Sequence, residues 1–584
     1  MSVLHSFTLS VMFLIAPFPS FTQTKGTVKA SLPSRYFELL EAGVKIVENR
    51  LAAEPDASLD ALESKPGWRH FPNAILMPAV LYTKAHRHNK SFGDPLKLQL
   101  ALRIGDFLVK AQESGNYSKR GDSDWDTYMW LEAYRLLENK LGEDRKKRWK
   151  KALLAELSLL KPQLAKRLDY PWYNAPFIIT SPNHYAIYAS TLLVGGRVFN
   201  KPDWVTMASQ VLHRFCVHEQ APDGYWGEHS QSGPTTGYDY LTLTQIALYY
   251  EHTRDPEALK ALRRSTDFHQ YFTYPDGTPA ETLNDRNRYW EPSMWGHFGF
   301  SHFPDGRRYA AFLTDHLSFD GDVNSFGANM QSFGRIAQNA LYFHDGNLAP
   351  IPQDLTNYAH AMKIPAGIRK TGPWVITYSG IIVPPVSLNN FFLDRQGNLS
   401  IYHEKTGLIV SGANSKHQPE LATFTEVIGT DSIHMPVSSY FRMNTGFDRL
   451  ALAYNVFFAT IDLPKPNPRQ LKLNITTTYK WGTASSELNF QLVLKPGQTL
   501  ETASGKKIVL GTEKINWNGS DPGRWIKHNG WTMHLPPHTN ITWPVYPFNP
   551  YTNSAETDLS HAVGRLYIPL KNEDQQFHFV VETD

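Results

Sequence analysis

The chain has 584 residues, of which 41% are hydrophobic and 19% are charged, and its formal net charge is +3. This composition is typical of a globular protein with two or three domains, and it excludes an intrinsically disordered chain. The near balance of charge argues against a nucleic-acid-binding protein, because the densest basic run, at 143–151, is accompanied by glutamates in a helical pattern. The single cysteine, Cys216, excludes an intramolecular disulfide framework.

The first residues have the pattern of a secretory signal. An apolar stretch at 7–17 is followed by small and polar residues, which predicts a signal peptide over 1–23. No later segment holds about 18 consecutive apolar residues, so we expect no membrane-spanning helix. The protein is therefore expected to be secreted or periplasmic.

From about 33 to 345, apolar residues recur every three or four positions, a pattern that predicts amphipathic helices. The segments that show it most clearly are 35–52, 97–112, 125–142, 148–168, 184–199, 204–218 and 241–253. Because no strand pattern interrupts them, we predict an all-α domain over 30–345.

An Asp-Gly pair recurs in the connections of this domain, at 223, 276, 305 and 345. Glycine after aspartate permits the positive φ that a tight turn needs. Repeated helical hairpins with loops at one end predict a ring of paired helices, an α/α toroid whose loops surround a central cleft.

After about 365 the composition changes to short segments rich in β-branched and aromatic residues, separated by Gly, Pro and Asn turns. The segments with this pattern are 374–386, 391–403, 406–414, 451–463, 471–481, 487–495, 531–537 and 577–584. We predict an antiparallel β-sandwich over 371–584, joined to the helices by a proline-rich linker over 346–370. The predicted fold class is thus an α+β multidomain chain, with the toroid followed by the sandwich.

Polar residues stand at the start of two predicted helices. Asn183 and His184 follow Pro182, and a Gly/Pro-rich loop leads to Tyr238 and Tyr240 at the start of a later helix. Neighbouring hairpins of a toroid are adjacent in space, so both helix starts are expected to face the same cleft. Each residue also has a purely structural explanation, since Asn183 can cap its helix, His184 can be a buried imidazole, and the tyrosines can pack in the core.

In these residues the chain resembles the heparinase II/III-like and alginate lyase-like polysaccharide lyases, which join an α/α toroid to an antiparallel β-sandwich. In that group an Asn opens one inner helix, sometimes with a His directly after it, and a Tyr opens a later inner helix beyond an Asp-Gly loop. Asn183, His184 and Tyr238 match this pattern within 181–240. The resemblance implies cleavage of a uronic-acid-containing polysaccharide by β-elimination.

The chemistry of that reaction explains the residue types. The C5 proton of a uronic acid becomes acidic when the neighbouring carboxylate is neutralised, and an amide and an imidazole can donate hydrogen bonds to it. A base must take the proton and an acid must protonate the leaving O4, and a tyrosine can fill either role. The resemblance also implies a His from the β domain, for which His403 is the candidate and His417 the alternative. The step requires no cofactor, and the sequence does not indicate a structural metal ion.

Residues close to the predicted loops are expected to hold an anionic polysaccharide. A tryptophan can serve as a platform for a sugar ring, and arginines can bind uronate carboxylates through paired hydrogen bonds. Ion pairs of these arginines with Glu281 or Asp285 are the structural alternative. The predicted substrate-binding residues are Trp226, Glu228, His229, Arg286, Arg288 and Tyr289.

Two other functions stay open. A toroid can also carry a glycoside hydrolase, whose acid and base would come from Asp126, Glu228, Asp239, Glu281 and Asp285. A glycan-binding protein without catalysis would need only the aromatic residues. The fold alone does not separate these functions.

Overall fold

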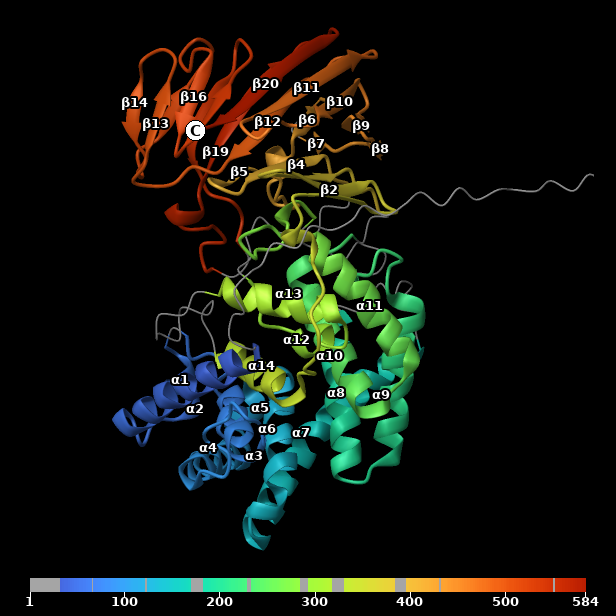
Figure 1. The fold of residues 1–584 in the computed structure, drawn as a ribbon, viewed down its shortest axis with the longest axis vertical. Coiled ribbons are helices and arrows are strands. Elements are labelled where there is room, and N and C mark those ends of the chain that lie inside the picture. The colour runs from blue at the N-terminus through green and yellow to red at the C-terminus, as the bar shows by residue number, and fades with distance from the viewer. Residues whose placement is uncertain are drawn as a thin grey trace, which may run out of the picture. The chain divides into compact units, whose positions relative to one another are not determined.

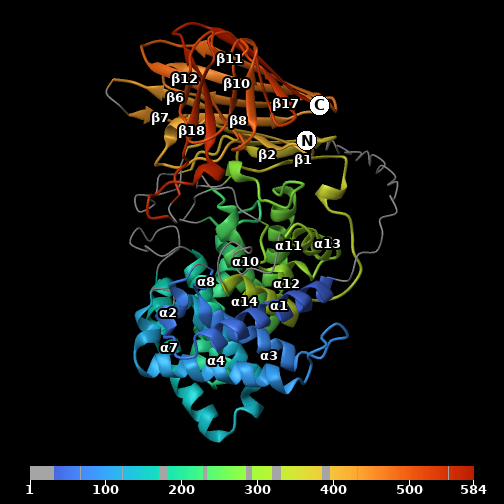
Figure 2. The same cartoon turned by 90° about the vertical axis from the view of Figure 1, so that its left-hand side faces the viewer.

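The computed structural model describes residues 32–65, 67–120, 123–169, 182–227, 233–283, 292–317, 330–383, 395–429, 432–549 and 552–584. The α-helices occupy the chain up to 342 and the strands begin at 357, as Figures 1 and 2 show. A search of the described helices finds none with the length and apolar character needed to cross a membrane. The predicted signal peptide at 1–23 lies outside the described residues.

The helical part consists of α-helices joined by short 3-10 and π-helical turns. The α-helices are α1 Leu32–Ala53, α2 Leu59–Glu63, α3 Leu76–Thr83, α4 Pro95–Glu113, α5 Asn116–Lys119, α6 Ser123–Leu137, α7 Glu143–Asp169, α8 Pro182–Val198, α9 Pro202–Arg214, α10 Thr236–Thr253, α11 Pro256–Tyr271, α12 His297–Phe300, α13 Pro304–Asp315 and α14 Met330–Tyr342. The short turns include η1 Phe71–Ile75, η2 Glu138–Lys140, η4 Phe215–Glu219 and η5 Glu281–Leu283.

Contacts between these helices close into a ring. α6 packs against η1 and α8, α8 against α10, α10 against α12, α12 against α14, and α14 against η1 again. The helices α1, α4, α7, α9, α11 and α13 each pack against one or two members of this ring. The arrangement is that of the predicted α/α toroid, with a buried core of apolar side chains between the two layers.

The strands form two antiparallel sheets. The strands are β1 Asn357–Ala361, β2 Ala366–Thr371, β3 Trp374–Ser379, β4 Asn398–His403, β5 Gly407–Ser411, β6 Phe424–Val427, β7 Ile433–His434, β8 Ser438–Met443, β9 Phe447–Ala453, β10 Phe457–Pro464, β11 Gln470–Tyr479, β12 Ser485–Leu492, β13 Thr499–Thr502, β14 Lys507–Val509, β15 Ile515–Trp517, β16 Trp525–His528, β17 Trp531–His534, β18 Asn540–Val545, β19 Val563–Leu570 and β20 Gln575–Thr583. One sheet has the order β1-β2-β3-β4-β5-β12-β19-β18-β15, with β6 paired to β12 and β7 to β6. The other has the order β14-β13-β16-β17-β20-β11-β10-β9-β8.

Burial along the strands shows where each sheet packs. β9, β10 and β11 alternate between buried and more exposed residues, as expected when one face of a sheet meets the core and the other meets water. β3 and β4 are instead buried at every position, because the residues around η5 pack against them. The ring of Tyr274 stacks on Tyr402 at 4.9 Å, and the hydroxyl groups of Thr282 and Ser400 are hydrogen-bonded.

Two expectations about the connections are corrected. Gly224 and Gly277 have positive φ and form the expected turns, but Asp305 and Gly306 lie in the first turn of α13. A Cβ on Gly306 would stand 2.1 Å from the carbonyl oxygen of Phe300, so this glycine serves close packing. The expected linker at 346–370 contains β1 and most of β2, so the structured β domain begins earlier than predicted.

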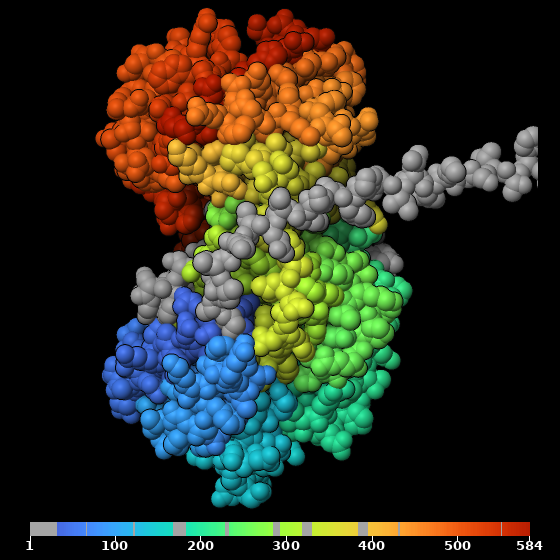
Figure 3. All heavy atoms as spheres, in the orientation of Figure 1, coloured from blue at the N-terminus to red at the C-terminus, as the bar shows by residue number. Residues whose placement is uncertain are grey.

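The segment that follows α14 is held against the helices, as Figure 3 shows in yellow. Ala349 donates its backbone N–H to the carbonyl of Pro304, and Arg308 pairs with Asp354 at 2.5 Å. Gln353 donates to the carbonyl of Gln270 at 2.7 Å. These contacts fix the path of the chain from α14 to the first strand.

Candidate functional site

The start of α8 holds the first candidate residue, Asn183. Pro182 occupies the first helical position, where its fixed φ suits a helix and its missing N–H costs no hydrogen bond. Asn183 is 1% exposed, and neither Nδ2 nor Oδ1 has a hydrogen-bond partner among the residues that the structure describes. The side chain therefore does not cap α8, and the capping explanation is wrong. Leaving a buried amide unpaired lowers the stability of the fold by about 1–3 kcal/mol. A ligand that hydrogen-bonds to the two free atoms would recover this cost.

His184 is the next residue, and its side chain is 30% exposed. Nδ1 lies 3.7 Å from Oδ2 of Asp124 in the first turn of α6, and the imidazole meets the edge of Trp125 with ring centroids 4.7 Å apart. Asp124 also accepts a hydrogen bond from the Tyr188 hydroxyl at 2.8 Å. Burial, together with the charge of Asp124, raises the pKa of Tyr188. Residues of α6 thus orient a His184 that is accessible from outside, so the buried-imidazole explanation does not apply.

The start of α10 holds the second group of candidates. Tyr238 is partly exposed, and the next residue, Asp239, is buried. Asp239 accepts hydrogen bonds from the Trp226 backbone N–H at 2.6 Å and from His269 Nε2 at 2.8 Å. These bonds fasten the preceding loop and α11 to the helix start, and so fix the backbone that carries Tyr238. α10 packs directly against α8, and the Ser190 hydroxyl near the middle of α8 donates a hydrogen bond to Gln245 Oε1 near the middle of α10 at 2.6 Å.

Tyr240 and Trp226 are packed in the core. The Tyr240 ring stacks on His269 with centroids 3.9 Å apart, and its hydroxyl is hydrogen-bonded to that of Tyr309 at 2.7 Å. Trp226 is buried, and its indole N–H donates to the carbonyl of Phe215 at 2.9 Å. Tyr240 is therefore a packing residue of the core. The expectation that Trp226 serves as a sugar platform is wrong, because the faces of the Trp226 ring are covered.

The two β-domain histidines are also in packed positions. His403 ends β4, where it is buried against the ring of Trp374 and lies within hydrogen-bond distance of the Thr583 hydroxyl, at 3.2 Å. Burial lowers the pKa of His403. These partners all belong to the β domain, which corrects the expectation that His403 reaches the helical site. His417 stacks on Phe548 at 4.0 Å.

Several predicted residues cannot be placed. Glu228, His229, Asp285, Arg286, Arg288 and Tyr289 lie outside the described residues.

A buried arginine on α14 was not predicted. Arg335 is 2% exposed, donates to Gln338 Oε1 at 3.1 Å, and lies over the Trp295 ring with 3.9 Å between Cζ and the ring centroid. Within the described part of the chain, its Nε has no hydrogen-bond partner. Burial lowers the pKa of Arg335 to about 9. A desolvated cation of this kind is a candidate for binding an anionic group. The sequence did not predict it, because Arg335 lies on the apolar face of a helix that has no motif around it.

The described carboxylates proposed for a hydrolase are engaged in the fold. Asp126 is buried and receives hydrogen bonds from Arg120 and Asn73. Glu281, the first residue of η5, is buried against β4 and the end of β5, where Oε1 accepts from the Ser400 hydroxyl at 2.6 Å and from the backbone N–H of Gly412 at 3.0 Å. Burial raises the pKa of Glu281. Together with Asp239, they hold helices and strands in place.

Comparisons with known proteins give no match at the level of sequence. No protein-family model matches the chain, and a search of curated proteins finds no match either.

Solved structures, in contrast, share the fold. The chondroitin AC lyase of Streptomyces coelicolor A3, solved in complex with chondroitin sulphate, has a TM-score of 0.53 at 11% identity, covering 96% of this chain and 81% of that one. A Paenibacillus xanthan lyase has a TM-score of 0.53 at 9% identity and 95% coverage, and the present chain spans 58% of its length. Heparinase III gives 0.50 at 13% identity, covering 90% of this chain and 77% of that one.

These likenesses confirm the predicted fold class, a helical toroid followed by an antiparallel β-sandwich. They also confirm, at the level of fold, the resemblance to polysaccharide lyases that Asn183, His184 and Tyr238 suggested.

Proposed function

We propose that the protein is a polysaccharide lyase that cleaves a uronic-acid-containing polysaccharide by β-elimination. The observation that carries the proposal is the buried amide of Asn183, whose donor and acceptor atoms both lack a partner at the start of α8. Partly exposed His184 follows it directly, and partly exposed Tyr238 stands at the start of the adjoining helix. An amide, an imidazole and a phenol are the groups that this elimination needs.

In the proposed reaction Asn183 and His184 donate hydrogen bonds to the uronate carboxylate. This neutralisation makes the C5 proton acidic and stabilises the enediolate that forms when the proton leaves. Tyr238 takes the proton or delivers one to O4 as the C4–O4 bond breaks. The products are a new reducing end and a sugar with a C4–C5 double bond, and the step uses no cofactor.

The substrate class is supported by the fold and by the cation on α14. The structurally similar chondroitin AC lyase binds chondroitin sulphate, an anionic polysaccharide. Arg335 places a buried positive charge on α14, a member of the same ring of helices as α8 and α10. We further propose that residues 1–23 direct the protein to the periplasm or the medium, where such polymers occur.

Two alternatives are less well supported. A glycoside hydrolase needs an acid and a base near the sugar, but Asp126, Asp239 and Glu281 are buried and hydrogen-bonded within the fold. A glycan-binding protein would rely on aromatic rings alone, but Trp226, the predicted sugar platform, and Tyr240 are covered.

A panel of uronate polymers tests the proposal. The full-length protein is incubated with each polymer while the ultraviolet absorbance of the C4–C5 double bond and the number of reducing ends are followed together. A lyase produces both signals in equal amounts. Reducing ends without the absorbance would establish a hydrolase, and binding without either signal would establish a glycan-binding protein.

A further inference from the structure

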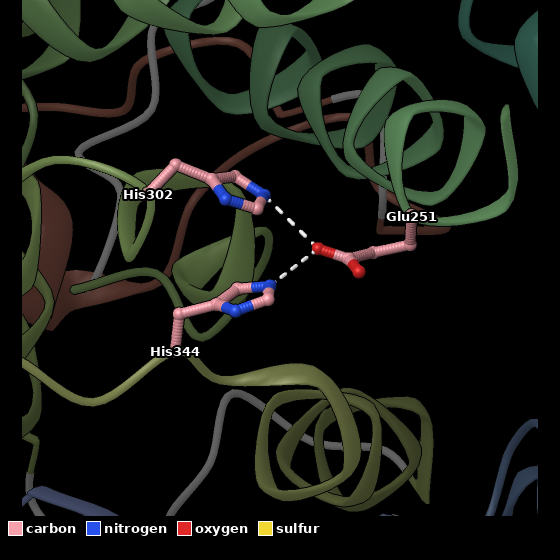
Figure 4. A group of neighbouring side chains, drawn as sticks. All are labelled: Glu251, His302 and His344. Atoms are coloured by element: carbon pink, nitrogen blue, oxygen red, sulfur yellow. Dashed lines mark hydrogen bonds and ion pairs between the residues drawn. The ribbon is translucent and has the colours of Figure 1, made fainter. Parts of the chain in front are cut away.

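A second group of polar side chains lies at the opposite end of α10. Glu251 stands in the last turn of that helix, His302 lies between α12 and α13, and His344 follows α14. Figure 4 shows the two imidazoles directed toward the carboxylate from separate parts of the chain. Glu251 is 13 residues after Tyr238, which corresponds to roughly 20 Å along a helix. The group is therefore separate from the proposed lyase site.

The three side chains bring one ligand atom each to a common point. Nε2 of His344 lies 2.6 Å and Nε2 of His302 lies 3.0 Å from the same oxygen, Oε1 of Glu251. All three atoms lie within 4.8 Å of one another. Two histidines and one carboxylate are a common ligand set for zinc in proteins.

His302 lacks a hydrogen bond although it is close to the carboxylate. Its side chain is 9% exposed, and Nε2 is buried without a partner that meets hydrogen-bond geometry. The 3.0 Å contact with Oε1 is close enough for an ion pair but does not meet hydrogen-bond geometry. In the neutral tautomer that carries its proton on Nδ1, Nε2 has a lone pair that a cation beside Oε1 can accept.

The surroundings hold these ligands in place. Oε2 of Glu251 pairs with Arg254 at 2.9 Å, which leaves Oε1 facing the histidines. The His302 ring packs edge-to-face on Tyr250 with centroids 4.8 Å apart. The backbone N–H of His344 donates to the Ser301 hydroxyl at 3.0 Å. Contacts of this kind orient metal ligands in known sites.

We propose that Glu251, His302 and His344 bind a divalent transition-metal ion, with zinc as the ion that best suits the ligand set. Zinc takes imidazole nitrogen and carboxylate oxygen at about 2.0–2.2 Å, so adjacent ligand atoms of a tetrahedral site are about 3.3 Å apart. The present spacings of 2.6 and 3.0 Å require only a slight opening of the group. His344 is 39% exposed, so an ion has a route to the site and water can complete its coordination.

The ion would join three segments that are distant in sequence. Glu251 fixes the end of an inner helix, His302 the connection before α13, and His344 the segment that leads from the helices to the first strand. Binding to the folded state alone raises its stability by mass action. The ion is therefore expected to stabilise the junction of these three segments.

The test uses the full-length chain after treatment with a chelator. Calorimetric titration with zinc chloride should give one ion per chain, and the melting temperature should rise by several degrees with zinc and not with magnesium, which prefers oxygen ligands. Cobalt(II) provides a signal that needs no variant, because its visible absorption becomes intense when it enters a four-coordinate site.

Two variants locate the ion. His344→Ala removes the most exposed ligand and should lower zinc affinity by roughly 100-fold or more, since loss of an outer-shell partner alone costs about 10- to 100-fold. The matched control is His213→Ala, which removes a 49% exposed histidine that pairs with a single carboxylate, Asp255, at 2.7 Å. It should bind zinc like the unmodified protein. Equal binding by His344→Ala, or no binding by the unmodified chain, would leave only an ion-paired cluster and overturn the proposal. If the unmodified chain binds zinc but does not cleave any uronate polymer, the proposed lyase function fails while the metal site stands.

Discussion

Replacement of Asn183 by alanine separates a functional amide from a structural one. Its Nδ2 and Oδ1 have no partners, so Asn183→Ala breaks no hydrogen bond and removes a buried group whose desolvation costs about 1–3 kcal/mol. We expect the melting temperature to stay unchanged or to rise. Turnover of a cleaved polymer should nevertheless fall roughly 10²–10³-fold, the loss expected when one preorganised donor to an oxyanion disappears.

Asn89 provides the matched control. It is also a buried asparagine of the helical part, but Nδ2 donates to the carbonyls of Leu81 and Lys84, both at 2.8 Å, and Oδ1 accepts from the Ser91 N–H at 3.1 Å. Asn89→Ala should therefore lower the melting temperature and leave the turnover per folded molecule intact. Both variants are assayed for double-bond formation and for thermal unfolding. If Asn183→Ala behaves like Asn89→Ala, the side chain is structural and our reasoning fails.

Three further predictions concern single residues. Tyr238→Phe removes only a hydroxyl and should lower kcat about 10²–10⁴-fold with little change in melting temperature, whereas Tyr240→Phe should lose stability and keep its kcat; the reverse result would exchange their roles. Burial lowers the pKa of His297 to about 4, from about 6.5 when unfolded, so the unfolded chain binds more protons in this range. The free energy of unfolding should then fall by up to about 3 kcal/mol between pH 6.5 and 4, and a His297→Gln variant that keeps the whole decline would contradict this origin. Glu281→Gln should stay folded and active, because burial raises the pKa of Glu281 and an amide oxygen can accept the same two hydrogen bonds; an inactive folded variant would favour the hydrolase.

Local periodicity was sufficient to predict that a helical domain precedes a β domain. A helix that buries one face places an apolar residue there at every turn, and a strand does so at every second residue. It was insufficient where one residue type serves two purposes. Glycine at 306 permits close approach to Phe300 inside a helix, whereas glycine at 224 permits a positive φ in a turn. The sequence pair Asp-Gly is the same in both. β1 was missed because its residues are mostly exposed, and such an edge strand carries no apolar signal.

In the candidate site, too, the sequence predicted what nearby residues determine and missed what residues distant in the chain determine. The placement of Asn183, His184 and Tyr238 at helix starts follows from residues within a few positions of each. The burial of Tyr240 depends on the Tyr309 hydroxyl, which comes from another helix. The zinc site is even less visible in the sequence, since its ligands come from three separate segments.

The unpaired polar atoms at the helix starts support the proposal that these positions serve a ligand. Buried polar groups in folded proteins are nearly always hydrogen-bonded, and Asp239 meets this rule with two short bonds. Among the described residues, the hydroxyls of Thr235 and Thr236 at the start of α10 and the amide of Asn183 at the start of α8 do not. Stability alone would have favoured apolar side chains of similar size at these three positions. Under the proposed function, a uronate bound at these helix starts would supply the missing acceptors and donors, and the unfavourable burial in the free protein would then serve a preorganised anion site.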